Sequence, residues 1–94
     1  MYIVFLTYTR PMEEIEALLE PHIDWLNRYF TAGAFISAGR KDPRTGGMIM
    51  VREMDRKQLD VILAEDPFQQ VASYDVTKVN ITRSAKKFAE LTGI

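Results

Sequence analysis

The segment Tyr2–Tyr8 constrains the fold most, because it predicts a β-strand that is apolar on both faces. It consists of Tyr-Ile-Val-Phe-Leu-Thr-Tyr, and β-branched and aromatic residues favour strands. A strand without a polar face belongs in the middle of a sheet that is covered on both sides. The 94 residues are expected to form one domain, 1–94, because a second core would not fit in this length.

The rest of the chain predicts three helices and three more strands. Apolar residues at helical spacing indicate a first helix, with Thr9 as its N-cap and Gly33 just beyond its end. Pro21 predicts a kink or a restart within it, since proline in a helix interior costs about 3 kcal/mol. Asp55 is the expected cap of a second helix that Pro67 stops. The other expected elements are strands at 34–39, 48–51 and 72–81, and a last helix that Thr82 or Ser84 caps and Gly93 closes.

Apart from the last helix, the order of elements is β-α-β-β-α-β. Two right-handed crossovers around a hairpin predict an α+β, ferredoxin-like antiparallel sheet with both helices on one face and an extra C-terminal helix. The other face of the sheet would then be bare, although the strands at 2–8 and 48–51 are apolar on both sides. A monomer would expose a large apolar patch. We therefore expect a homodimer in which two sheets stack face to face.

Composition excludes several classes of function. The chain has no cysteine and one histidine, which rules out a Cys/His zinc site, and we expect no metal and no cofactor. A net charge of −1 gives no sign of the excess positive charge that binding to nucleic acid or an anionic membrane requires. An RNA-binding sheet of the same topology needs aromatic residues on its third strand, and 47–52 has none. No run approaches the roughly 20 apolar residues of a membrane span, and the start lacks signal-peptide features, so we expect a cytoplasmic protein.

His22 is the best candidate for chemistry, because histidine is the side chain whose ordinary pKa, about 6.5, allows proton transfer near neutral pH. In the predicted topology the second helix ends at the same end of the molecule at which His22 begins a helical segment. Asp66 would therefore come within reach of His22, and a carboxylate that holds one ring nitrogen prepares the other for acid/base work. The same layer should contain Tyr8, Ser37, Gly39 and Arg40.

Each candidate also has a structural interpretation. A lone histidine commonly packs on or between helices, and an aspartate before a proline commonly ends a helix. Ser37 could be a hydroxyl satisfied within its strand, and Arg40 a solvated turn residue.

Several short motifs together resemble the YciI-like (YCII-related) family. They are Pro21-His22-x-x-Trp25-Leu26, Gly33, Ser37-Ala38-Gly39 and Asp66-Pro67-Phe68. The resemblance implies a dimeric ferredoxin-like α/β barrel, similar to muconolactone isomerases and small barrel monooxygenases. It implies a catalytic pair at His22 and Asp66, and a small polar residue of the same cavity at Ser37. The family usually has Gly-Pro where this chain has Gly39-Arg40, and an arginine there could select an anionic ligand.

Two functions remain open from the sequence. The first is a cofactor-independent enzyme of the isomerase, lyase or dehydrochlorinase type, with His22 and Asp66 as catalytic residues on a small cyclic or unsaturated substrate. Ser37 and Arg40 would bind the substrate. The second is a non-catalytic dimeric module that binds a metabolite in the same cleft.

Overall fold

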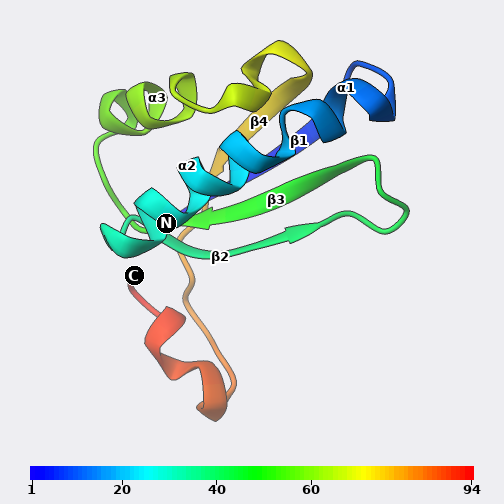
Figure 1. Ribbon diagram of the computed structural model, residues 1–94. Helices are drawn as coiled ribbons and strands as arrows, with labels where there is room; N and C mark the ends of the chain where they lie inside the picture. The colour runs from blue at the N-terminus through cyan, green and yellow to red at the C-terminus, as the bar shows by residue number, and fades with distance from the viewer.

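Four antiparallel strands form the sheet of the computed structural model, which describes residues 1–94 (Figure 1). The sheet order is β2-β3-β1-β4, so the doubly apolar first strand is central as predicted. With helices packed over one face, this order confirms the predicted α+β, ferredoxin-like fold. The strands are β1 (Tyr2–Tyr8), β2 (Phe35–Arg40), β3 (Gly46–Val51) and β4 (Ala72–Lys78).

The helical layer consists of α1 (Met12–Ala17), α2 (Leu19–Thr31), α3 (Arg56–Ala64) and the short 3₁₀ helix η1 (Pro67–Gln70). The predicted break in the first helix is confirmed, but it lies at Leu18, and α2 begins before Pro21. The reason is steric: a proline ring disturbs the preceding turn, so the interruption falls ahead of the proline. None of these helices has the length and apolar content needed to cross a membrane.

The helix ends follow local chemistry, with one exception. Gly33 has φ +81° and follows α2 as predicted, and the next amide, from Ala34, donates to the Tyr29 carbonyl at 3.0 Å. Asp55 caps α3 as predicted by accepting from the Lys57 amide. Thr9 was expected to cap the first helix, and this is wrong: Pro11 is the N-cap residue, without a side-chain cap bond. Proline has no side-chain acceptor for a cap bond, but its fixed φ of about −65° is compatible with the start of a helix.

The core lies between the helical layer and one face of the sheet. Trp25 of α2 is fully buried, and its indole N–H donates to the Ile62 carbonyl of α3 at 3.0 Å. This bond satisfies a buried donor and links the two main helices. The core cluster to which Trp25 belongs also includes Val4, Leu6, Ile15, Phe35, Ile49, Val51, Leu59, Leu63 and Phe68.

A one-residue bulge in β2 decides which of its side chains face the helices. Phe35 pairs with Val51, but the next pair is Ser37 with Met50, so two residues of β2 match one of β3. An extra residue reverses the alternation of the strand. Ala38 therefore shares the helix-facing side of the sheet with Phe35, whereas an unbulged strand would have presented Ser37 there.

The segment after β4 differs most from the sequence prediction. β4 ends at Lys78 and not at residue 81, because Lys78 pairs with Tyr2, the first residue of β1. A C-terminal helix is present as predicted, and Gly93 follows it with φ +80°, but it is not an α-helix, and Ala85 rather than Thr82 or Ser84 is its N-cap. The structure has the 3₁₀ helix η2 (Lys86–Leu91), which lies on the open side of the sheet away from the other helices (Figure 1). A short α-helix depends on tertiary packing for its stability, and no residue of η2 is buried.

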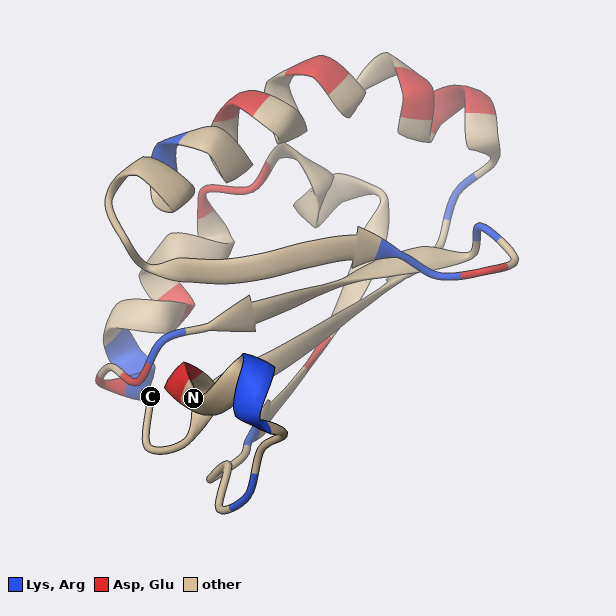
Figure 2. Cartoon of the chain, turned by 90° about the horizontal axis from the view of Figure 1, so that it is seen from below, with Lys and Arg blue, Asp and Glu red and all other residues tan.

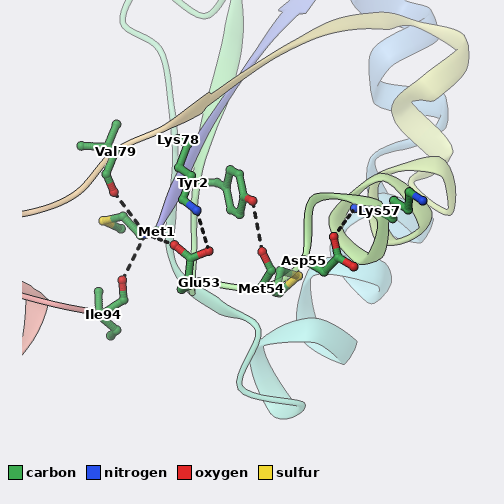
Figure 3. A network of polar contacts seen from close by, with 9 residues as sticks. All are labelled: Met1, Tyr2, Glu53, Met54, Asp55, Lys57, Lys78, Val79 and Ile94. Atoms are coloured by element: carbon green, nitrogen blue, oxygen red, sulfur yellow. Dashed lines mark hydrogen bonds and ion pairs between the residues drawn. The ribbon is translucent and has the colours of Figure 1, made fainter.

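The two ends of the described chain meet at the end of β1 that lies farthest from Tyr8. The Met1 amine donates to the carbonyls of Val79 and Ile94, each at 3.1 Å (Figure 3). Glu53 lies 3.4 Å from this amine and 3.1 Å from the Lys78 ammonium. The hydrogen bond from Lys78 lowers the pKa of Glu53 below its ordinary value. These contacts join both ends of the described chain to the end of β4 and to the segment between β3 and α3.

Candidate active site

His22 and Asp66 form a hydrogen-bonded pair at the end of the molecule where β1 finishes. His22 Nδ1 lies 2.7 Å from Asp66 Oδ1, and both side chains are largely buried. His22 is in the first turn of α2, directly after Pro21, and Asp66 follows α3. The predicted juxtaposition of these two residues thus occurs in the structure.

Asp66 is fixed on both of its carboxylate oxygens. It is the N-cap of η1, and its Oδ1 accepts the Phe68 amide at 2.9 Å as well as the histidine. Its Oδ2 accepts the Tyr74 hydroxyl of β4 at 2.5 Å. Burial raises the pKa of Tyr74 well above its ordinary value, and the hydrogen bond to Asp66 raises it further. Tyr74 therefore stays protonated at neutral pH and donates to the carboxylate.

Two aromatic rings lie against the imidazole. It stacks on Phe68 with 3.8 Å between ring centroids and an angle of 4° between the planes. Trp25 lies on α2 with its ring centroid 5.6 Å from that of His22. Asp66 and these rings together fix the orientation of the imidazole. Nε2 makes no hydrogen bond within the protein, so it is the ring nitrogen available for a ligand.

A cavity of about 350 Å³ lies beside the imidazole, between α2 and the sheet. Most of its wall is apolar, and its only formally charged side chains are Arg40 and Arg44. Figure 2 shows basic segments on either side of an acidic one where β2 leads into the β2–β3 turn; Arg40 ends β2, and Arg44 lies in the turn. The full lining is Leu6, Tyr8, Leu19, His22, Ile23, Leu26, Ala38, Gly39, Arg40, Arg44, Gly47, Met48, Ile49 and Phe68.

The structure brings together all but one of the predicted site residues. His22, Arg40, Tyr8 and Gly39 line the cavity, and Asp66 holds the imidazole from behind. Ser37 does not line it. Because of the bulge in β2, it lies on the opposite face of the sheet, in a shallow hollow with Met50 and residues of η2.

Sequence reasoning missed three residues of this site. Tyr74 was assigned only to a strand, although its alternation with Ala72 and Val76 could have placed it on the helix-facing side. Phe68 follows the Asp66-Pro67 turn, and nothing in the sequence predicts that its ring stacks on the imidazole. Arg44 lies in a turn, where arginine is most commonly solvated. No group of three or more acidic or histidine side chains that could hold a metal ion occurs in the structure.

Comparison with known proteins identifies the family. No curated protein matches the chain. The family model of the YCII-related domain matches residues 1–82, which include all four strands, the helical layer and the His22–Asp66 pair. A match over this share of the sequence, together with the ferredoxin-like order of the sheet, shows that the chain belongs to the YCII-related domain family.

Proposed function

We propose that this protein is an enzyme that uses His22 as a general acid/base, with Asp66 as its orienting partner. The substrate would be a small cyclic or unsaturated molecule, and the reaction an isomerisation, a lyase reaction or a dehydrochlorination. The single observation that carries the proposal is the buried pair, whose second ring nitrogen is unpartnered beside a largely apolar cavity. Oriented imidazoles beside apolar cavities are suited to proton transfer.

The hydrogen bonds around Asp66 support one arrangement of protons for this mechanism. Asp66 accepts from Phe68 and Tyr74, as an ionised carboxylate would. With Asp66 ionised, the proton of its bond with His22 would be on Nδ1, and the lone pair on Nε2. Nε2 would take a proton from a substrate carbon, and Asp66 would stabilise the imidazolium.

The fate of that proton distinguishes the reaction classes. Returning it to a different carbon isomerises the substrate. If chloride or another group leaves with its bonding electron pair as the C–H bond breaks, the result is an elimination. An apolar cavity wall around the imidazole favours either reaction, because charges that form in such a cavity interact more strongly with Asp66 than they would in water.

The functional unit we propose is a homodimer joined through the open face of the sheet. That face carries Ile3 and Phe5 of β1 beside Met48 and Met50 of β3. Phe5 is 44% exposed in the single chain, although it lies at the middle of a central strand. Exposed apolar area at the centre of a sheet is typical of an interaction surface.

Deuterium incorporation would test the proposed proton transfer directly. Wild-type protein in D₂O is incubated with a panel of unsaturated lactones, halogenated hydroquinones and enoates, and proton NMR follows loss of C–H signals. His22→Asn retains an amide that can donate to Asp66 but has no group that titrates near neutral pH. We expect exchange with the wild type and a loss of about 100-fold or more with His22→Asn.

Asp24→Asn, a charge change on the exposed side of the same helix, is the matched control and should exchange normally. Unfolding curves confirm that each variant is folded. Equal exchange by wild type and His22→Asn would overturn the proposal. Saturable binding without exchange or turnover would favour a metabolite-binding module instead.

A further inference from the structure

We propose that the substrate of this cavity carries a carboxylate, and that Arg44 binds it with assistance from Arg40. This inference rests on the proposed function only in taking the cavity beside His22 as the substrate site. It assigns to Arg44 a role in substrate specificity, and it narrows the substrate to small organic anions with an apolar, unsaturated body.

Arg44 has the donor edge that a carboxylate fits, and that edge has no partner. Its Nε and Nη2 are buried and make no hydrogen bond within the protein. These two nitrogens form the side of the guanidinium that presents two parallel N–H groups, the geometry in which arginine binds a carboxylate through both oxygens. Buried donors without acceptors are energetically costly, so an acceptor in the adjoining cavity would relieve this cost.

Only one weak ionic contact holds the Arg44 guanidinium in its present position. Its side chain is 29% exposed, and its one ionic contact is Nη1 to Glu16 Oε1 at 3.8 Å. Glu16 is itself 60% exposed, so solvent screens this contact and it is weak. Arg44 already lines the cavity, and a rotation of its guanidinium would bring the unpartnered edge to a bound ligand.

The charges around the cavity favour an anion. The Arg40 side chain makes no hydrogen bond or ion pair in the structure, and no acidic side chain lines the cavity. Two other cations nearby are partnered: Lys41 donates to the Thr7 hydroxyl and Arg10 pairs with Glu14. The unpartnered Arg40 side chain and the free Nε–Nη2 edge of Arg44, whose one ion pair is the weak contact with Glu16, therefore match a ligand with one anionic end and one apolar end.

A matched pair of probes tests the charge preference. Cyclohex-1-enecarboxylate and its primary amide differ by one charge and share a cyclic unsaturated body. We expect the carboxylate to bind at least 10-fold more tightly to the wild type, measured by NMR titration of the His22 ring protons. Arg44→Gln should weaken carboxylate binding about 10- to 100-fold, because a charge-assisted hydrogen-bonded pair is lost, and should leave amide binding unchanged.

Control variants distinguish binding of the carboxylate in the cavity from a general effect of the protein's charge. Lys41→Gln removes a cation from the same turn that does not line the cavity, and it should change carboxylate affinity less than 3-fold. Glu16→Gln should strengthen carboxylate binding, since it frees Arg44 from a competitor. Equal affinity for the two probes, or equal weakening by Arg44→Gln and Lys41→Gln, would overturn the proposal.

This test and that of the proposed function can fail separately. Carboxylate selectivity that depends on Arg44 and persists in His22→Asn supports the anion subsite even if no substrate exchanges a proton. Exchange of neutral substrates that depends on His22, with no preference for the carboxylate probe, supports the catalytic pair and contradicts the subsite.

Discussion

At the scale of single residues, the two buried polar or charged side chains, His22 and Asp66, belong to one hydrogen-bonded cluster. Asp66 accepts from the Phe68 amide and the Tyr74 hydroxyl and also binds the imidazole of His22, so a buried carboxylate is fully satisfied. The sequence predicted the His22–Asp66 pair, because each residue adjoins a proline that marks a helix boundary, Pro21 before His22 and Pro67 after Asp66. It could not predict Tyr74, since that contact depends on how β4 pairs with β1.

Replacing Tyr74 should change stability in a pH-dependent way. Tyr74→Phe removes a hydrogen bond to a charged acceptor, so we expect a loss of about 1.5–3 kcal/mol at pH 7 in urea unfolding. Because the pKa of Tyr74 is raised in the folded state, the unfolded chain releases this proton first, from about pH 10.0 upward. The wild type should therefore lose stability as pH rises above 10, and Tyr74→Phe should lose less.

Tyr29→Phe is the comparison for this experiment: the hydrogen bond with Glu65 also raises the pKa of Tyr29, but this phenol lies near the protein surface. Because solvent weakens that interaction, Tyr29→Phe should change the alkaline stability profile less than Tyr74→Phe does. Identical profiles for wild type and Tyr74→Phe between pH 8 and 11 would contradict the role given to Tyr74.

At the scale of elements, local signals predicted the ends of the helices better than the course of the strands. Gly33 and Asp55 act through their own backbone conformation and side chain, so sequence alone identified them. The end of β4 at Lys78 depends on where β1 begins, and the η2 segment depends on whether a core is available to it. Such features are set by distant parts of the chain and leave no local signal.

Two glycines offer a direct comparison of backbone conformation. Neither Gly33 nor Gly39 has an atom within 4 Å of an added Cβ, but only Gly33 has a positive φ, +81°. Gly33→Ala should cost about 1–2 kcal/mol because the left-handed conformation strains an L-residue. Gly39→Ala should be neutral or stabilise by up to about 1 kcal/mol, since glycine weakens a strand. Chemical denaturation measures both, and equal effects would contradict this account of α2 termination.

At the scale of the whole molecule, the sheet has one packed face and one face that is largely open. The order of elements predicted this division, and the apolar residues of β1 and β3 on the open face led to the expectation of a homodimer. The position of η2 on the same side was not predicted. A partner sheet would have to pack beside η2 or displace it.

A charge on the open face tests the proposed homodimer. Phe5→Glu should convert a dimer into a monomer in sedimentation or light-scattering measurements, because the carboxylate would be buried without a partner. Val61→Glu, at an apolar position of α3 that is 62% exposed, should leave the mass unchanged. A wild-type monomer at all concentrations, or a dimer in Phe5→Glu, would contradict the proposal.

The bulge in β2 has a consequence for how this site can tolerate changes in chain length. Because Ile36 is the surplus residue, its deletion should give a regular strand in which Phe35 still pairs with Val51 and Ser37 with Met50. Ser37 would then stay on the open face, and Arg40 would stay on the side of the cavity. The bulge thus acts as a buffer of one residue, which β2 can lose without a change in the side chains that reach His22.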